Sequence, residues 1–273
     1  MAMAGSREQD EPAIIRSSDN QTIKLVRSLR QRKTREAERL FVLEGLRLVS
    51  EALTRGFQPK AVLLREDKEA LARELAGLGG QLLAYRLVEA RVFDSIAETV
   101  TPQGVIAVLG IPEPKIPENE QPLVVVADRI SDPGNLGTLI RVSAGAGATA
   151  VVLTEGSVDP YNSKVVRAGM GAHFQVPLFW LDDELRVWIE RTCVNRVLAD
   201  ANGNEDYDLF DWNAPSALIL GPETGGFSNV ARDLSTATAR IPVAGGIESL
   251  NAAIAGAVML FEANRQRRAL REG

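Results

Sequence analysis

The chain has 273 residues, of which 45 % are hydrophobic and 25 % charged, which is typical of a globular protein and not of a disordered or fibrous one. The net charge of −5 argues against a general nucleic-acid binder, and the longest apolar runs are too short to cross a bilayer. Cys193 is the single cysteine and His173 the single histidine, so the sequence holds no disulfide and no Cys/His metal cluster. We therefore expect a cytoplasmic protein of two domains, without a metal or a membrane segment.

Residues 1–15 are small, polar and acidic, and they show no periodicity, which predicts a disordered leader. The pattern that follows predicts an α/β domain over residues 16–110. Its predicted helices span 21–34, 44–55, 67–76 and 88–96, and its predicted strands span 40–43, 61–64, 81–85 and 105–109.

The first predicted helix carries a basic excess that the net charge hides. Between Lys24 and Arg39 the basic residues outnumber Glu36 and Glu38. Ile23, Val26 and Leu29 recur at the spacing of one helix face, which leaves the basic residues on the exposed side. Such a face is either simply solvated or binds an anionic partner.

A proline-rich stretch with three glutamates follows, over residues 111–122. It is too rich in proline for a helix or a central strand, which predicts an extended linker and a domain boundary.

The last part of the chain, 123–273, alternates between apolar strands and helices. Near-continuous apolar strands of this kind predict a mostly parallel sheet covered on both faces. The predicted strands span 123–127, 150–153, 175–179, 196–200, 216–220 and 239–242, and the predicted helices span 135–146, 162–170, 182–191, 228–235 and 249–268.

Three turns follow strands of this predicted sheet: 132–135, 221–226 and 243–249. Ligands bind at the carboxyl ends of parallel strands, so these turns could converge on one site. The glycines of the first turn do not form G-x-G-x-x-G, and the acidic residue expected some 20 residues later is missing, which argues against a nicotinamide or flavin enzyme.

Three side chains near these turns could take part in binding or catalysis, or could have a structural role only. Arg141 could direct its charged fork toward a phosphate, or could be a surface cation. Ser249 could contact a substrate, cap the last helix, or both. Glu223 could handle a proton, although fixing the neighbouring turn is the simpler role.

The segments NLGTLIR, LILGPETGGFS and IPVAGGIESLN resemble, in order and spacing, the three signature motifs of the SpoU/TrmH family of RNA ribose methyltransferases, part of the SPOUT superfamily. The resemblance covers 123–265. The segments NQTIKLVRSLRQRKTR and FVLEGLRLVSEAL also resemble the L30e/L7Ae-like substrate-binding domain of rRNA-modifying members.

The resemblance implies an α/β domain with a deep trefoil knot, S-adenosylmethionine held mainly by backbone groups, and a homodimer with close helix packing over 252–257. It implies functional roles for Asn135, Arg141, Glu223, Ser249 and Asn251. The cofactor-binding positions would be Leu220, Gly221, Gly226, Ile241, Val243 and Leu250. The basic helix described above would then supply the RNA-binding positions, Lys24, Arg27, Arg30, Arg32, Lys33 and Arg35. Phe227, Val243 and Ala252 depart mildly from the residues usual in the family.

The reaction implied is methyl transfer to a ribose 2′-hydroxyl, in 23S rRNA rather than tRNA because an RNA-binding domain is present. A guanidinium keeps its proton at neutral pH and is a poor base, so we expect Arg141 to bind a phosphate while a phosphate oxygen or water accepts the proton. A tRNA ribose methyltransferase, a base methyltransferase and a non-catalytic RNA-binding or ribosome-assembly protein are the alternatives.

Overall fold

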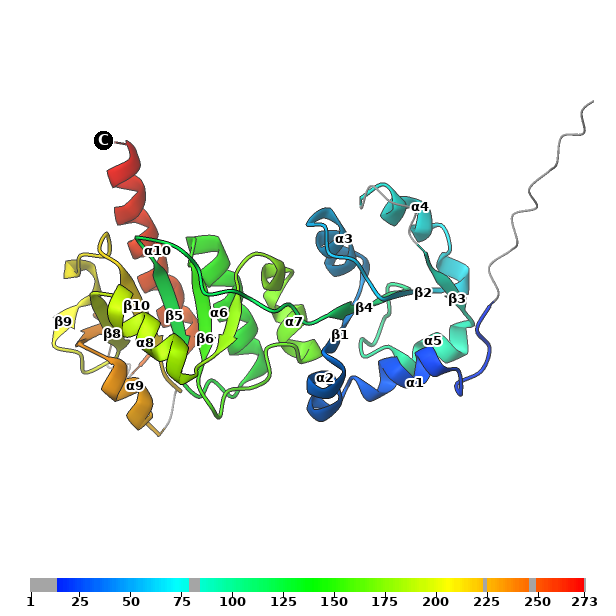
Figure 1. Ribbon diagram of the computed structural model, residues 1–273, viewed down its shortest axis with the longest axis horizontal. Helices are drawn as coiled ribbons and strands as arrows, with labels where there is room; N and C mark the ends of the chain where they lie inside the picture. Colours follow the sequence, from blue (N-terminus) through cyan, green and yellow to red (C-terminus); the bar gives the residue numbers. More distant parts are fainter. Residues whose placement is uncertain (1–13, 79–83, 223–224, 246–248, 273) are drawn as a thin grey trace, which may run out of the picture. The chain divides into compact units, whose positions relative to one another are not determined.

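The computed structural model describes residues 14–78, 84–222, 225–245 and 249–272, and the chain divides into two compact units after Gly110 (Figure 1). The sheet of the first unit has the order β1-β4-β2-β3, in which β4 is antiparallel to both neighbours and β3 is parallel to β2. Its strands are β1 (Leu40–Glu44), β2 (Ala61–Arg65), β3 (Arg86–Val88) and β4 (Val105–Gly110), and its α-helices are α1 (Gln21–Ser28), α2 (Arg32–Glu38), α3 (Leu46–Thr54), α4 (Leu71–Ala76) and α5 (Ala90–Ile96).

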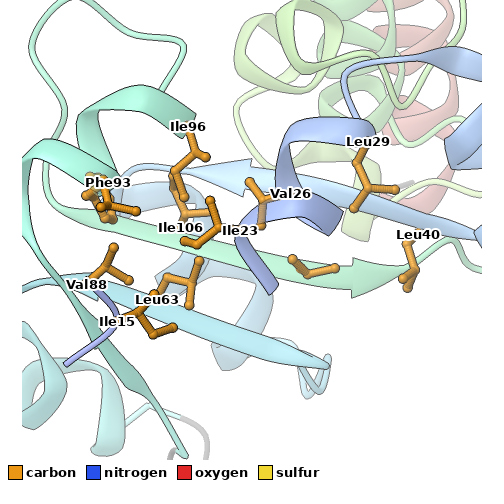
Figure 2. Packing of buried hydrophobic residues seen from close by; sticks show 12 residues of the cluster. Ile15, Ile23, Val26, Leu29, Leu40, Leu63, Val88, Phe93, Ile96 and Ile106 are labelled. Carbon is orange, nitrogen blue, oxygen red and sulfur yellow. The ribbon is translucent and has the colours of Figure 1, made fainter. Parts of the chain in front are cut away.

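One core cluster of the first unit lies between this sheet and the helices α1 and α5 (Figure 2). Ile23 and Val26 of α1 share this cluster with Phe93 of α5, and Ile106 of β4 lies beside Ile23. The stripe predicted from the spacing of Ile23, Val26 and Leu29 is confirmed, since all three are buried.

The predicted leader extends too far along the chain, because Ile15 belongs to this core. Its side chain is buried, its N–H donates to the carbonyl of Leu87 at 2.8 Å, and its carbonyl accepts from the N–H of Glu89 at 2.9 Å. Residues 1–13 of the predicted leader lie outside the described residues.

The predicted single helix over 21–34 is wrong, because the structure has α1 and α2 with a break at Leu29–Gln31. The guanidinium of Arg35 reaches back to this break and donates to the carbonyls of Leu29 and Arg30, at 2.8 and 2.9 Å. Carbonyls that the ended helix leaves without an intrahelical partner are thereby satisfied.

The strand predicted over 81–85 is displaced. The structure places β3 at Arg86–Val88, where it pairs with β2 from Leu63 to Arg65. Residues 81–83 of the prediction lie outside the described residues.

The second unit contains a parallel seven-stranded sheet with the order β7-β6-β5-β10-β8-β11-β9, which confirms the mostly parallel sheet predicted. The short strand β9 and the position of β7 were not anticipated. The strands are β5 (Leu123–Ala127), β6 (Ala150–Leu153), β7 (Leu178–Trp180), β8 (Asn195–Ala199), β9 (Glu205–Asp206), β10 (Ser216–Leu220) and β11 (Ala237–Arg240), and the α-helices are α6 (Pro133–Ala146), α7 (Ser163–Gly169), α8 (Asp183–Thr192), α9 (Asn229–Leu234) and α10 (Ala252–Glu272).

Helices cover both faces of this sheet, as predicted (Figure 1). On one face Val124, Val126 and Ile219 pack with residues of α8 and α9. On the other, α6 and α10 lie against the sheet, and Gly256 of α10 sits close to Leu139 of α6 and Leu220 of β10. Successive side chains of a strand point to opposite faces of the sheet, so the apolar strands of this sheet contribute to the packed core on each face.

Close helix packing depends on Gly137 of α6. A Cβ at this position would lie 2.5 Å from the Cβ of Ala168 and 2.6 Å from the carbonyl of Val165, both in α7. Real atoms do not approach so closely, so the small residue lets α6 and α7 touch through their backbones.

The predicted linker carries no helix or strand between Gly110 and Leu123. Its Ile116 packs against the apolar cluster of the second unit. No helix within the described residues is both long and apolar enough to cross a membrane.

Candidate active site

A cavity opens at the carboxyl ends of β8, β10 and β11, the edge at which ligands bind in parallel sheets. Its walls come from these strand ends, from the turn around Gly226, and from the start of α10. The structure brings together there all the predicted cofactor-binding positions, namely Leu220, Gly221, Gly226, Ile241, Val243 and Leu250.

Glycines shape the wall that follows β10. A Cβ at Gly221 would lie 2.6 Å from the ring of Phe227, so only glycine lets this ring close the cavity. Gly225 and Gly226 have φ of 85° and 66°, a left-handed conformation that other residues adopt at a cost. The turn can therefore bring its backbone to the cavity edge.

Asp128 holds the end of this turn from the neighbouring strand β5. Its buried carboxylate accepts from the N–H and the hydroxyl of Ser228, at 2.8 and 2.6 Å, and from the hydroxyl of Thr154 at 2.9 Å. Ser228 in turn caps α9 by accepting from the N–H of Ala231. This network fixes the path of the chain from the cavity into α9.

Asn135 and Asn251, two predicted functional residues, are in contact. The amide of Asn251 donates to the side-chain oxygen of Asn135 at 2.9 Å. Asn251 also caps α10, because its own side-chain oxygen accepts from the N–H groups of Ala253 and Ile254, at 3.0 and 3.3 Å. The helix was predicted to begin at Ser249, so the cap falls two residues later than expected.

The other predicted catalytic residues have different positions. Ser249 is exposed and lines the cavity. Arg141 is an exposed residue of α6 that does not line the cavity, and its side chain makes no hydrogen bond or ion pair with the described residues. Gly137, one helical turn before Arg141, packs on α7, so Arg141 projects close to the α6–α7 seam. Glu223 lies outside the described residues.

Two charged residues line the cavity that sequence reasoning missed, Asp200 and Arg232. Asp200 directly follows β8, and one of its oxygens accepts from the N–H of Asn202 at 2.8 Å. The sequence could have indicated Asp200 as a site residue, because it is a polar residue directly after an apolar strand. Asp128 stands in the same position after β5. These charges suit a ligand that is itself charged at more than one point.

The lone histidine and the lone cysteine are packed in the interior and do not line the cavity. Nε2 of His173 lies 2.8 Å from the carbonyl of Pro160, and burial lowers the pKa of this imidazole to about 4. Burial raises the pKa of the Cys193 thiol to about 11. Both groups are therefore uncharged at neutral pH.

The predicted RNA-binding residues of the first unit are exposed except for one. Arg30 donates to the carbonyl of Ala97 at 3.1 Å, and Arg32 pairs with Glu36 at 2.7 Å. Arg35 is buried and bonded to backbone carbonyls, which does not fit a phosphate contact. The exposed set is Lys24, Arg27, Arg30, Arg32 and Lys33.

Comparisons with known proteins agree with this division into two units. The model of the SpoU rRNA Methylase family matches residues 122–261, and that of the MRM3-like substrate binding domain matches residues 20–107. The chain is 34 % identical to rRNA methyltransferase 3, mitochondrial, of Mus musculus, over 88 % of this chain and 71 % of that protein. It is also 34 % identical to the 23S rRNA (uridine(2479)-2′-O)-methyltransferase of Streptomyces viridochromogenes, over 97 % of each chain.

A solved structure shares both units. The AdoMet-bound rRNA methyltransferase from Sinorhizobium meliloti superposes with a TM-score of 0.81 at 33 % identity, and the match covers 93 % of this chain and 97 % of that one.

Proposed function

Because the chain belongs to the SpoU rRNA methylase family, we propose that it transfers a methyl group from S-adenosylmethionine to a ribose 2′-hydroxyl of 23S rRNA. The observation that carries this proposal is the cavity, where all the positions expected to hold the cofactor converge beside the Asn135–Asn251 pair.

The cavity residues fit S-adenosylmethionine. Leu220, Ile241 and Leu250 offer apolar surface for an adenine, and the open backbone at Gly221 offers hydrogen-bonding groups. Asp200 and Arg232 supply charges opposite to those of an amino group and a carboxylate. When bound, the cofactor supplies a methyl group on a positively charged sulfur, which an oxygen nucleophile can attack.

The side chains around the cavity have the remaining task of placing the ribose oxygen and helping it lose its proton. The hydrogen bond from Asn251 fixes the amide of Asn135 at the start of α6, where it can orient the ribose. Arg141, exposed on the same helix, binds the adjacent phosphate and stabilises developing negative charge. A guanidinium holds its proton, so a phosphate oxygen or water accepts the ribose proton.

The first unit binds the RNA around the target. Its exposed cations Lys24, Arg27 and Lys33 supply phosphate contacts, which position RNA without reading its sequence. The match to the substrate binding domain supports this role.

The protein acts as a homodimer through α10. Ile254 and Phe261 are 51 % and 52 % exposed, and their spacing places them on one side of the helix. The small residues 252–257 were expected to form the dimer interface. Gly256, however, packs against Leu139 and Leu220 of the same chain, so this residue supports the fold of the subunit. The family relationship also supports a trefoil knot in the second unit.

The test is methyl transfer from radiolabelled S-adenosylmethionine to unmodified 23S rRNA, with tRNA as a parallel substrate, followed by nuclease mapping. We expect label on a ribose of the rRNA. Label on a base, or on tRNA alone, would contradict the proposed substrate. Absence of label from every RNA, with the cofactor bound, would identify a non-catalytic RNA-binding protein.

A further inference from the structure

Arg129 has a backbone conformation that its side chain does not favour. Within the described residues, three non-glycine residues have positive φ, namely Arg39, Arg129 and Met170. Arg39 and Met170 end the helices α2 and α7, where a left-handed residue is usual. Arg129 follows strand β5 and ends no helix, so its φ of 52° needs another explanation.

The contacts of Arg129 supply this explanation. Its guanidinium donates to the carbonyl of Gly226, and its Nε lies 3.8 Å from the carboxylate of Asp128. Its N–H donates to the hydroxyl of Thr154 at 3.0 Å. The side-chain stem passes Gly156, where a Cβ would lie 3.1 Å from Cγ of Arg129. The strained backbone thus directs one long side chain across to the turn after β10.

That turn is held at its far end by Asp128 through Ser228, and Arg129 holds its glycine part. Gly225 and Gly226 have no side chains to anchor them, and both have positive φ. The neighbouring carbonyl of Phe227 accepts a hydrogen bond from Nε of Arg232 at 3.3 Å. Gly226 and Phe227 line the cavity, whereas Arg129 does not. Arg129 therefore holds the cavity wall from behind.

We propose that Arg129 is a positioning residue of the cofactor site, whose guanidinium fixes the turn 225–227 in the shape that binds S-adenosylmethionine. It does so through the carbonyl of Gly226, without touching the cofactor. The inference rests on the proposed function, since it takes the cavity as the cofactor site.

The decisive variant is Arg129→Gly. Glycine adopts a left-handed conformation freely, so this change relieves the backbone strain and removes only the side-chain contacts. A residue needed only for folding would lower the unfolding midpoint when replaced. A positioning residue leaves the midpoint at or above that of the wild type and weakens cofactor binding.

We would measure binding of S-adenosylhomocysteine by calorimetry in the full-length protein, with urea unfolding alongside. Arg129→Gly should weaken binding at least tenfold, and Arg129→Lys, which keeps one charged donor, should fall between it and the wild type. In methyl transfer, KM for the cofactor should rise by the same factor, with kcat and KM for RNA changing less than twofold.

The matched control is Arg39→Gly, which makes the same change at a left-handed residue of the first unit, with φ of 55°. Its binding of S-adenosylhomocysteine should equal that of the wild type. Binding by Arg129→Gly within twofold of the wild type would overturn the role of Arg129 and leave the proposed function standing. A wild-type protein that binds no S-adenosylhomocysteine would overturn both.

Discussion

Asn251 donates a hydrogen bond of 2.9 Å to Asn135, which lies 116 residues earlier in the chain. One residue precedes α10 and the other lies in the first turn of α6, so the bond ties the two helix starts together. Asn251 also caps its own helix, which means that a single side chain serves both the fold and the site.

The two roles of Asn251 can be separated by substitution. Asn251→Ala removes cap and donor, and should cost about 1 kcal/mol of unfolding free energy as well as activity. Asn251→Asp keeps an oxygen that caps α10 but loses the amide donor, so its stability should stay within about 0.5 kcal/mol of wild type. We expect methyl transfer to fall at least about tenfold in both, measured in single turnovers. Full activity in Asn251→Asp would show that donation from Asn251 to Asn135 is dispensable.

Replacement of Arg141 should impair the reaction without impairing cofactor binding, because Arg141 lies outside the cavity. Arg141→Gln removes the charge and should slow methyl transfer about a hundredfold, and Arg141→Lys should remain well below wild type because it lacks the bidentate fork. Incorporation of labelled methyl groups measures the rate of methyl transfer, and binding of S-adenosylhomocysteine measures the affinity for the cofactor.

The control is Arg191→Gln, which removes an exposed arginine from α8 and should change neither quantity. Wild-type activity of Arg141→Lys would argue that a point charge suffices.

Replacement of Asp128 should destabilise the second unit. Its carboxylate is surrounded by donors from Ser228 and Thr154, and the amide of Asp128→Asn would point a donor at one of them. We expect a loss of about 2 kcal/mol in urea unfolding. Asp132→Asn is a suitable comparison, because Asp132 is an exposed cap of α6 and asparagine caps equally well. Equal stabilities for the two variants would contradict the importance of the buried network.

Stability should fall with pH below neutrality because of His173. Its pKa is lowered by burial from 6.5 to about 4, so the unfolded chain takes up a proton first as the pH falls, and stability is lost between these values. From pH 7.5 to pH 5 the expected loss is about 2 kcal/mol. Because the chain has one histidine, His173→Gln should flatten this part of the curve in urea titrations. A variant with the same pH slope as wild type would assign the loss to other groups.

Charges on the exposed side of α10 should dissociate the proposed dimer. Ile254→Glu or Phe261→Glu places a carboxylate where an apolar side chain is half exposed. Light scattering should give the chain mass of 29.5 kDa for these variants and twice that mass for the wild type. Val187→Glu, at an exposed position of α8, should stay dimeric. A monomeric wild type would refute the dimer.

The position of the cavity was predictable because its lining residues directly follow strands that the sequence pattern reveals. Gly221 and Ile241 stand at or just beyond the ends of apolar strands, and parallel strands bring such ends to one edge. The break between α1 and α2 was not predictable, since it depends on Arg35 turning back to the carbonyl of Leu29. The contact of Arg129 with Gly226 joins positions 97 residues apart, and no local pattern reports it.

The order of strands in the second unit also bears on its synthesis. Strand β10 lies between β5 and β8, although both precede it in the chain. Until residues 216–220 have left the ribosome, β5 and β8 each present an unpaired row of N–H and C=O groups, a template for joining other chains. The centre of the sheet is thus filled late. A nascent chain stalled before Ser216 would leave one edge of β5 and both edges of β8 unpaired, because β11 also follows, and would be prone to aggregate.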